Sequence, residues 1–177
     1  SNNQLRSVVI PGTIISIGIS AFTGNQIASL ELRSSVTSIG NDAFSGNKLT
    51  SLDIPDSVES IGAASFYGNQ ISSLKLGNSL TNIRYSTFSN NQITSLNIPE
   101  SLSGIEGYAF SDNKLTSLTI PNTVNSIDQY AFQGNDFSYV NIDMTDIPSR
   151  LFSGIQVGEL VLGHNVRNVG DRSFLSS

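Results

Sequence analysis

Residues 49–70 read LTSLDIPDSVESIGAASFYGNQ, and most of the remaining chain consists of variants of this stretch. Its phenylalanine recurs every 22 residues from Phe22 to Phe132, and then after 20 and 22 residues at Phe152 and Phe174. Such a period is typical of a solenoid, in which every repeat forms one coil and buries its apolar groups only by stacking on neighbouring coils. We therefore predict one solenoid domain over residues 1–177, with 22-residue repeats and about eight coils.

Each repeat contains two short runs in which apolar and variable residues alternate. In the quoted stretch these runs are residues 52–54 and 58–61, and Pro55 follows the first of them. Alternation with a period of two indicates strands that bury one face, and proline stands where pairing stops because it lacks an N–H donor. The sequence thus predicts a mainly β fold in which the middle residue of the first run points to solvent.

The rest of each repeat is expected to form the opposite side of the coil. Residues 62–66, GAASF, predict a single turn of α or 3₁₀ helix with Phe66 as the largest core residue. Two residues after each phenylalanine comes Gly, Asn or Asp, and these residue types tolerate positive φ, so we predict a left-handed turn there. The next position is a column of amides, which we interpret as a structural ladder bonded to neighbouring backbone and from one amide to the next. This column consists of Asn25, Asn47, Asn69, Asn91, Asn113 and Asn135.

The composition argues against several classes of function. The net charge is −5 and the 9 Lys and Arg residues are scattered, whereas a nucleic-acid binder needs a clustered basic face. There is no Cys, and the neighbours of the single histidine, His164, predict a turn, so we expect no catalytic residue, cofactor or metal site. No run approaches the roughly 20 apolar residues that a membrane span needs.

The chain begins in the middle of a repeat, because SNNQLRSV at residues 1–8 aligns with SNNQITSL at residues 89–96. We interpret it as an excised piece of a longer array. Any targeting signal, anchor or capping unit is then expected outside residues 1–177.

The repeats share the signature L-x-I-P-x-S-V-x-S-I-G-x-x-A-F-x-x-N-x-L-T-S-L, whose parts recur in phase, as in residues 54–55, 60–62 and 131–132. This signature resembles the BspA-like, or treponemal-type, class of leucine-rich repeats, found mainly in bacterial surface proteins and in some protist parasites. The resemblance implies a right-handed solenoid with a parallel sheet on its concave face. It also implies an exported or surface-displayed protein, since members bind host matrix and plasma glycoproteins or mediate bacterial co-aggregation, although no residue motif transfers those functions to this chain.

One repeat departs from the pattern. Phe137 replaces the usual Ile or Leu, Tyr139 replaces a column of serines, two residues are missing between Ile142 and Ile147, and Ile155 occupies the asparagine position. This unit is either the result of drift or a change of curvature late in the array, or a locally specialised surface.

Two variable columns are candidates for partner binding, because residues that change while the core stays constant are free to encode recognition. The middle column of the first strand, together with the irregular Tyr139, supplies Glu31, Asp53, Lys75, Asn97, Thr119, Asn141 and Tyr139. The column two residues before each phenylalanine ends in Tyr108, Tyr130, Arg150 and Arg172, an aromatic and cationic strip of residue types enriched in binding hot spots. The alternatives are a merely solvated strand face and long side chains that only cover the turn backbone.

These observations favour a non-enzymatic adhesion module, secreted or on a cell surface, that recognises a protein or glycan through one face of the solenoid. Two alternatives remain open. The array is a structural spacer that displays another domain, or it targets a larger surface enzyme to its substrate.

Overall fold

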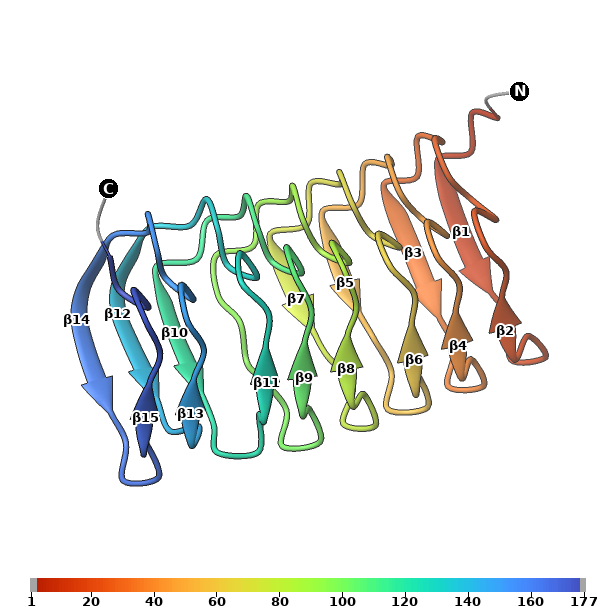
Figure 1. Ribbon diagram of the computed structural model, residues 1–177. Coiled ribbons are helices and arrows are strands. Elements are labelled where there is room, and N and C mark those ends of the chain that lie inside the picture. Colours follow the sequence, from red (N-terminus) through yellow and green to blue (C-terminus); the bar gives the residue numbers. More distant parts are fainter. Residues whose placement is uncertain (1–2, 176–177) are drawn as a thin grey trace.

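The computed structural model describes residues 3–175, which form a parallel β-solenoid whose coils stack along one axis. The N-terminus and the C-terminus lie at opposite ends of the stack (Figure 1). Two rows of strands run along it, as the two alternating runs of each repeat predict. No helix occurs among residues 3–175, so none spans a membrane.

The first row contains the longer strands, which pair in parallel across neighbouring coils. Ser7 pairs with Ser29 and Ser117 with Tyr139, an offset of 22 residues, whereas Tyr139 pairs with Glu159 at an offset of 20. Residues 95–98 occupy the same row without forming a regular strand. The strands of this row are β1 (Ser7–Ile10), β3 (Ser29–Leu32), β5 (Ser51–Asp53), β7 (Ser73–Lys75), β10 (Ser117–Ile120), β12 (Phe137–Ile142) and β14 (Val157–Leu162).

The second row contains two-residue strands that lie in front of the first row in Figure 1. They pair in parallel in the groups β2-β4-β6, β8-β9-β11 and β13-β15. The row is interrupted between β6 and β8 and again between β11 and β13, and the two missing residues of the irregular repeat fall in the corner that leads into β13. The strands of this row are β2 (Ser16–Ile17), β4 (Ser38–Ile39), β6 (Ser60–Ile61), β8 (Asn82–Ile83), β9 (Gly104–Ile105), β11 (Ser126–Ile127), β13 (Asp146–Ile147) and β15 (Asn168–Val169).

A stack of phenylalanine rings runs through the core, in one cluster with the buried residues of both strand rows. Neighbouring rings from Phe22 to Phe132 lie nearly parallel, with centroids 5.1–5.8 Å apart. The separation widens to 6.4 Å between Phe132 and Phe152, where the irregular coil begins, and Phe137 packs edge-on against both rings. The larger residue at 137 therefore fills space in the core, which favours the structural interpretation of that substitution.

The asparagine ladder is confirmed as a structural element. Asn69, for example, accepts a hydrogen bond from the backbone N–H of Leu49 in the preceding coil (3.1 Å) and donates to the carbonyls of Phe44 (2.9 Å) and Phe66 (3.1 Å). The same pattern recurs from Asn47 to Asn135. The expected bonds from one ladder amide to the next are absent among residues 3–175, because backbone groups use both ends of each amide.

The turns beside the phenylalanines differ from the expected helical turns. The left-handed position two residues after phenylalanine is confirmed, with φ between 52° and 75° from Gly24 to Gly154. A second left-handed position lies two residues before phenylalanine, where Ser20 has φ 54° and Ala64 has φ 52°. A helix needs consecutive negative φ values, so two left-handed residues four positions apart leave hydrogen-bonded turns in place of a helix.

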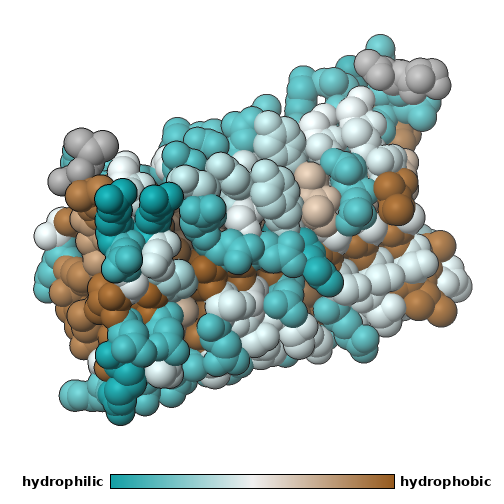
Figure 2. Space-filling model, viewed as in Figure 1, coloured by the Kyte–Doolittle hydropathy of each residue, from teal (hydrophilic) through white to brown (hydrophobic). Residues whose placement is uncertain are grey.

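Apolar residues are exposed at both ends of the stack, whereas the middle coils present mainly polar residues in the view of Figure 2. Leu160 and Leu162 are 37% and 45% exposed, although they pair in register with the buried Val140 and Ile142. Ile15 and Ile19 are exposed at the other end. Leu160 and Leu162 occupy core positions that no further coil of the described residues covers, whereas Ile15 and Ile19 align with Glu59 and Ala63 outside the core.

Candidate functional site

The middle column of the first strand row lies on the surface, as predicted, but its charges neutralise one another. Asp53 and Lys75 form an ion pair of 3.2 Å, and Glu31 pairs with Arg33 at 2.9 Å. Glu31, Asp53 and Lys75 border a shallow depression of about 490 Å³ that also contains Pro55. Exposed ion pairs of this kind contribute little binding energy and leave no unpaired charge for a partner.

The remaining residues of this column are polar and do not surround a pocket. Asn97 is exposed and lies in the stretch without regular strand, and Thr119 pairs in register with the half-buried Asn141. Tyr139, also half-buried, stands between Ser117 and Glu159 in the sheet. The structure places these residues on one face without bringing them together around a cavity.

The second predicted column is different, because its members are held in one backbone conformation. Tyr108, Tyr130, Arg150 and Arg172 all have left-handed φ values, of 58°, 66°, 61° and 56°. The rings of Tyr108 and Tyr130 stack at 5.4 Å with an interplanar angle of 25°. Coil-to-coil hydrogen bonds fix this backbone, as where Arg150 N–H donates to the Asp171 carbonyl at 3.0 Å.

A third tyrosine joins this strip and was missed from the sequence. Tyr85 is 53% exposed, and its ring meets that of Tyr108 at 5.6 Å and 67°, edge to face. It precedes Phe88 by three residues rather than two, so it falls outside the column that defined the strip. The available signal was the near-repeat spacing of Tyr85, Tyr108 and Tyr130, at intervals of 23 and 22 residues.

The three tyrosines surround a pocket of about 360 Å³, which we call the tyrosine pocket. Gly107 forms its floor, because the same position carries Tyr85 in the preceding coil and Gln129 in the following one. A Cβ on Gly107 would lie 3.5 Å from the Gln129 carbonyl and 3.7 Å from the Tyr85 ring, which is ordinary contact. The missing side chain therefore creates the pocket without being required by the fold.

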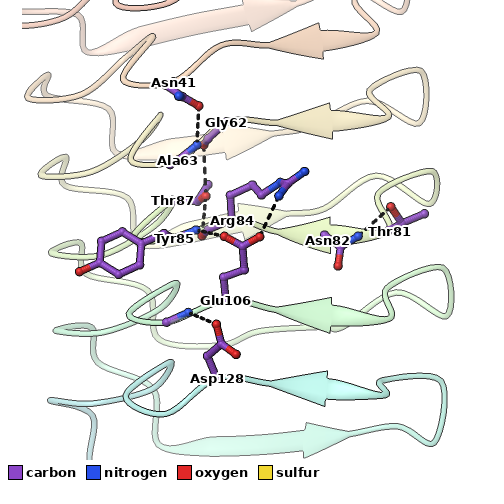
Figure 3. Close-up of polar contacts among 11 residues, drawn as sticks. Asn41, Gly62, Ala63, Thr81, Asn82, Arg84, Tyr85, Thr87, Glu106 and Asp128 are labelled. Atoms are coloured by element: carbon purple, nitrogen blue, oxygen red, sulfur yellow. Dashed lines mark hydrogen bonds and ion pairs between the residues drawn. The ribbon is translucent and has the colours of Figure 1, made fainter.

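Carboxylates from the next coil fix the backbone around this pocket (Figure 3). Glu106 accepts from the backbone N–H of Tyr85 (2.9 Å) and pairs with Arg84 (2.9 Å). Asp128 accepts from the backbone N–H of Gly107 at 3.2 Å through one oxygen. In Figure 3 the ring of Tyr85 points away from the second-row strands, which leaves it free on the outer side of the turn.

A second pocket, of about 420 Å³, continues the surface toward the C-terminus and is called the arginine pocket here. Arg150 and Arg172 line it together with Gln129, Ser149 and Asp171, so Gln129 borders both pockets. The ion pairs among residues 3–175 are Arg33–Glu31, Lys75–Asp53 and Arg84–Glu106, and neither arginine of this pocket takes part in one. Two cationic groups thus face solvent beside an aromatic pocket.

The remaining ionisable groups form no reactive constellation in the part of the chain that the structure describes. His164 lies exposed in a turn, as predicted. The pKa of Asp143 is lowered, first by the hydrogen bond from the backbone N–H of Asn165 and then by that from its side-chain amide, with a smaller effect of His164. Residues 3–175 contain no group of three or more metal-ligating side chains.

Stacked coils with a parallel strand row, a phenylalanine column and an asparagine ladder define the chain as a leucine-rich-repeat solenoid. The sequence matches the family model of the BspA type leucine rich repeat region in 6 copies, over residues 1–115 and 59–177. The chain therefore belongs to the BspA-type leucine-rich repeat family. No curated protein sequence matches it.

Solved structures with the same fold come from bacteria. A leucine-rich repeat protein from Bacteroides ovatus is 18% identical with a TM-score of 0.56, and the match covers 93% of this chain and 56% of that one. The pneumococcal vaccine antigen PcpA is 17% identical with a TM-score of 0.56, covering 96% and 48% of the two chains. A leucine rich cell surface protein from Faecalibacterium prausnitzii is 16% identical with a TM-score of 0.52, covering 98% and 68%. The chain thus spans about half the length of the first two structures, and the likeness concerns the fold alone.

Proposed function

We propose that this chain is a non-enzymatic binding module of a secreted or surface-displayed bacterial protein, and that it recognises a protein or glycan through the turn side of the solenoid. The observation that carries the proposal is the cluster of Tyr85, Tyr108 and Tyr130 around an open pocket. Exposed, well-ordered tyrosines are typical of binding hot spots because they offer a large contact area at a low cost in side-chain entropy. A role as a spacer does not explain the presence of such a cluster.

The buried columns and the surface columns of the repeat have different roles, and this difference supports the proposal. Phenylalanine and asparagine columns are buried and bonded from coil to coil, so they hold the turns in place. The surface positions on those turns vary from Ser20 to Arg172 without a change in backbone conformation. Such a scaffold presents side chains in a fixed arrangement, which lowers the cost of ordering them on binding. One protein with a similar fold is a leucine rich cell surface protein, which supports a surface location.

The test separates binding from spacing. Cells displaying the parent protein are compared with cells in which this segment is replaced by an unrelated rod of the same length, on a panel of host matrix and plasma glycoproteins. We expect adhesion to fall with the rod and with the double substitution Tyr108→Ala, Tyr130→Ala. Ala64 has φ 52° at the equivalent position, so alanine is compatible with that turn. Tyr67→Ala is the matched control, because Tyr67 is 42% exposed and lies outside the tyrosine pocket. Undiminished adhesion with the rod would show that the array is a spacer.

A further inference from the structure

The tyrosine pocket and the arginine pocket together form one continuous surface with an unusual mixture of groups. Tyr108, Tyr130, Arg150 and Arg172 occupy the same position in four successive coils. With a coil spacing of about 4.8 Å, this row is roughly 14 Å long. We call the surface formed by Tyr85, Tyr108, Tyr130, Gln129, Arg150 and Arg172 the tyrosine–arginine groove.

The polar groups of this groove are free to bind a ligand. Among residues 3–175, the side chains of Gln129 and the three tyrosines form no hydrogen bond within the protein. Asp128 uses one carboxylate oxygen for the Gly107 N–H and leaves the other open. The groove thus combines aromatic surface with an amide, phenols and a carboxylate oxygen, all available.

Such a combination suits a sugar better than an extended peptide. A pyranose ring carries C–H groups on its faces and hydroxyl groups around its edge, so it needs aromatic surface and nearby donors and acceptors at once. The residues of the groove lie on turns and not in a strand of either row, and the backbone N–H of Arg150 already donates to the Asp171 carbonyl. The groove therefore offers no strand that a peptide could extend by strand pairing.

The arginine pocket adds a charge requirement. Arg150 and Arg172 have no carboxylate partner, and guanidinium groups bind carboxylates through paired hydrogen bonds. The net charge of −5 disfavours a polyanion. Asp171 also lines the arginine pocket but forms an ion pair with neither arginine, so the two guanidinium groups are available to one acidic group of a ligand at this end of the groove.

We propose that the tyrosine–arginine groove binds an acidic glycan, with a neutral sugar in the tyrosine pocket and the carboxylate of an adjoining acidic sugar on Arg150 and Arg172. This inference rests on the proposed binding function and names its ligand class. A sialic acid and a uronic acid share the required carboxylate, and different probes distinguish them.

The experiment uses the intact chain and measures binding by calorimetry and by ligand-observed NMR. The probes are sialyllactose, its neutral counterpart lactose, and a glucuronate-containing tetrasaccharide. We expect one of the two acidic probes to bind at least about tenfold more tightly than lactose. Gly107→Gln fills the pocket floor with the side chain found at position 129, and Arg150→Gln removes one cation. Each substitution is expected to weaken binding of the acidic probe by at least about tenfold.

Two matched controls separate the groove from general effects. Ala63→Gln makes the same addition at the position equivalent to Gly107 in a coil outside the groove, and Lys114→Gln removes an exposed cation elsewhere. Both are expected to change affinity by less than about twofold. Equal melting temperatures of all four variants establish that folding is unaffected.

Three results would overturn the inference: no binding of any probe at millimolar concentration, equal affinity for acidic and neutral probes, or equal effects of the groove substitutions and their controls. If the glycans fail to bind while Tyr108→Ala, Tyr130→Ala still abolishes adhesion to a protein of the panel, the glycan inference is wrong and the binding function stands. If the unrelated rod preserves adhesion, the binding function itself is wrong.

Discussion

Replacing Asn69 by alanine tests whether the asparagine ladder stabilises the stack as the hydrogen bonds indicate. The side chain is buried, with 6% exposure, and joins two coils. Its oxygen accepts from Leu49 N–H (3.1 Å), and its nitrogen donates to the carbonyls of Phe44 (2.9 Å) and Phe66 (3.1 Å). Alanine removes these three bonds and a longer one from the amide nitrogen to the Tyr67 carbonyl (3.4 Å), at a site buried from bulk water.

The expected loss follows from which groups keep another partner. Phe44 carbonyl still accepts from Asn47 (3.0 Å), and Phe66 carbonyl still accepts from Asn91 (3.0 Å). Leu49 N–H has no other partner among the described residues, so it is left buried and unpaired. An orphaned buried donor costs about 1–3 kcal/mol, and each of the two hydrogen bonds whose acceptor keeps another donor costs about 0.5–1 kcal/mol, which gives a total loss of about 2–5 kcal/mol.

Urea unfolding followed by circular dichroism measures this loss, with Asn97→Ala as the control. Asn97 is exposed and its side chain bonds to no described residue, so the control is expected to lose less than about 0.5 kcal/mol. Hydrogen exchange then locates the effect, because each coil contacts only its neighbours and protection is expected to fall first at Leu49 and the adjoining coils. A loss for Asn69→Ala within about 0.5 kcal/mol of the control would refute a stabilising ladder.

Four further substitutions probe the core and one corner. Phe66→Ala removes a fully buried ring of the stack and is expected to cost about 3–5 kcal/mol, with protection from hydrogen exchange lost locally; uniform protection along the chain would contradict nearest-neighbour stacking. Ser65 is fully buried and its hydroxyl has no partner, so Ser65→Ala is expected to be neutral or to stabilise the protein by up to about 1 kcal/mol in thermal unfolding. Thr87→Ala loses a hydroxyl bond of 2.9 Å to a carbonyl and is expected to destabilise the protein. The same sign for both substitutions would be inconsistent with this explanation. The pKa of Asp143 is lowered in the folded state, so the stability that this carboxylate contributes is present above its unfolded pKa of about 3.8 and is lost as the pH falls through its folded pKa. The free energy of unfolding of Asp143→Asn is therefore expected to fall less steeply below pH 4 than that of the original protein. An unchanged pH profile would count against the contact with Asn165.

Much of the fold was predictable because each coil repeats the same local chemistry. Alternating residues predicted both strand rows, and Gly, Asn or Asp two residues after phenylalanine predicted the left-handed turn. The second left-handed position was not predictable, because Ser20, Ala64 and Tyr108 share no property that favours positive φ. Hydrogen bonds between coils accompany that conformation at five of these positions, such as the bond from Ser20 N–H to the Asn41 carbonyl at 2.8 Å, and a sequence pattern within one repeat does not contain them.

The candidate site was predictable in part for the same reason. Tyr108 and Tyr130 stood out because they occupy one column, whereas Tyr85 belongs to the neighbouring column and joins them only through the packing of adjacent coils. The missing side chain at Gly107 could have been recognised from the sequence, because neighbouring repeats carry Tyr85 and Gln129 at the same position. On the strand face, the sequence predicted exposure correctly but not that Asp53 and Lys75 would neutralise one another.

The irregular repeat is best understood as a single structural change with linked compensations. The corner before β13 is two residues shorter than in the other coils, and the ring centroids of Phe132 and Phe152 lie 6.4 Å apart. Ile155 provides no amide for the ladder, so the N–H of Phe137 donates to the Gln156 carbonyl at 3.2 Å, and the larger ring of Phe137 fills the widened core. The larger side chain at Phe137 is therefore explained by packing in the core and needs no ligand to explain it. The surface residues that no packing requirement explains lie elsewhere, around Gly107, and this is the reason to seek a partner at the tyrosine pocket before the irregular coil.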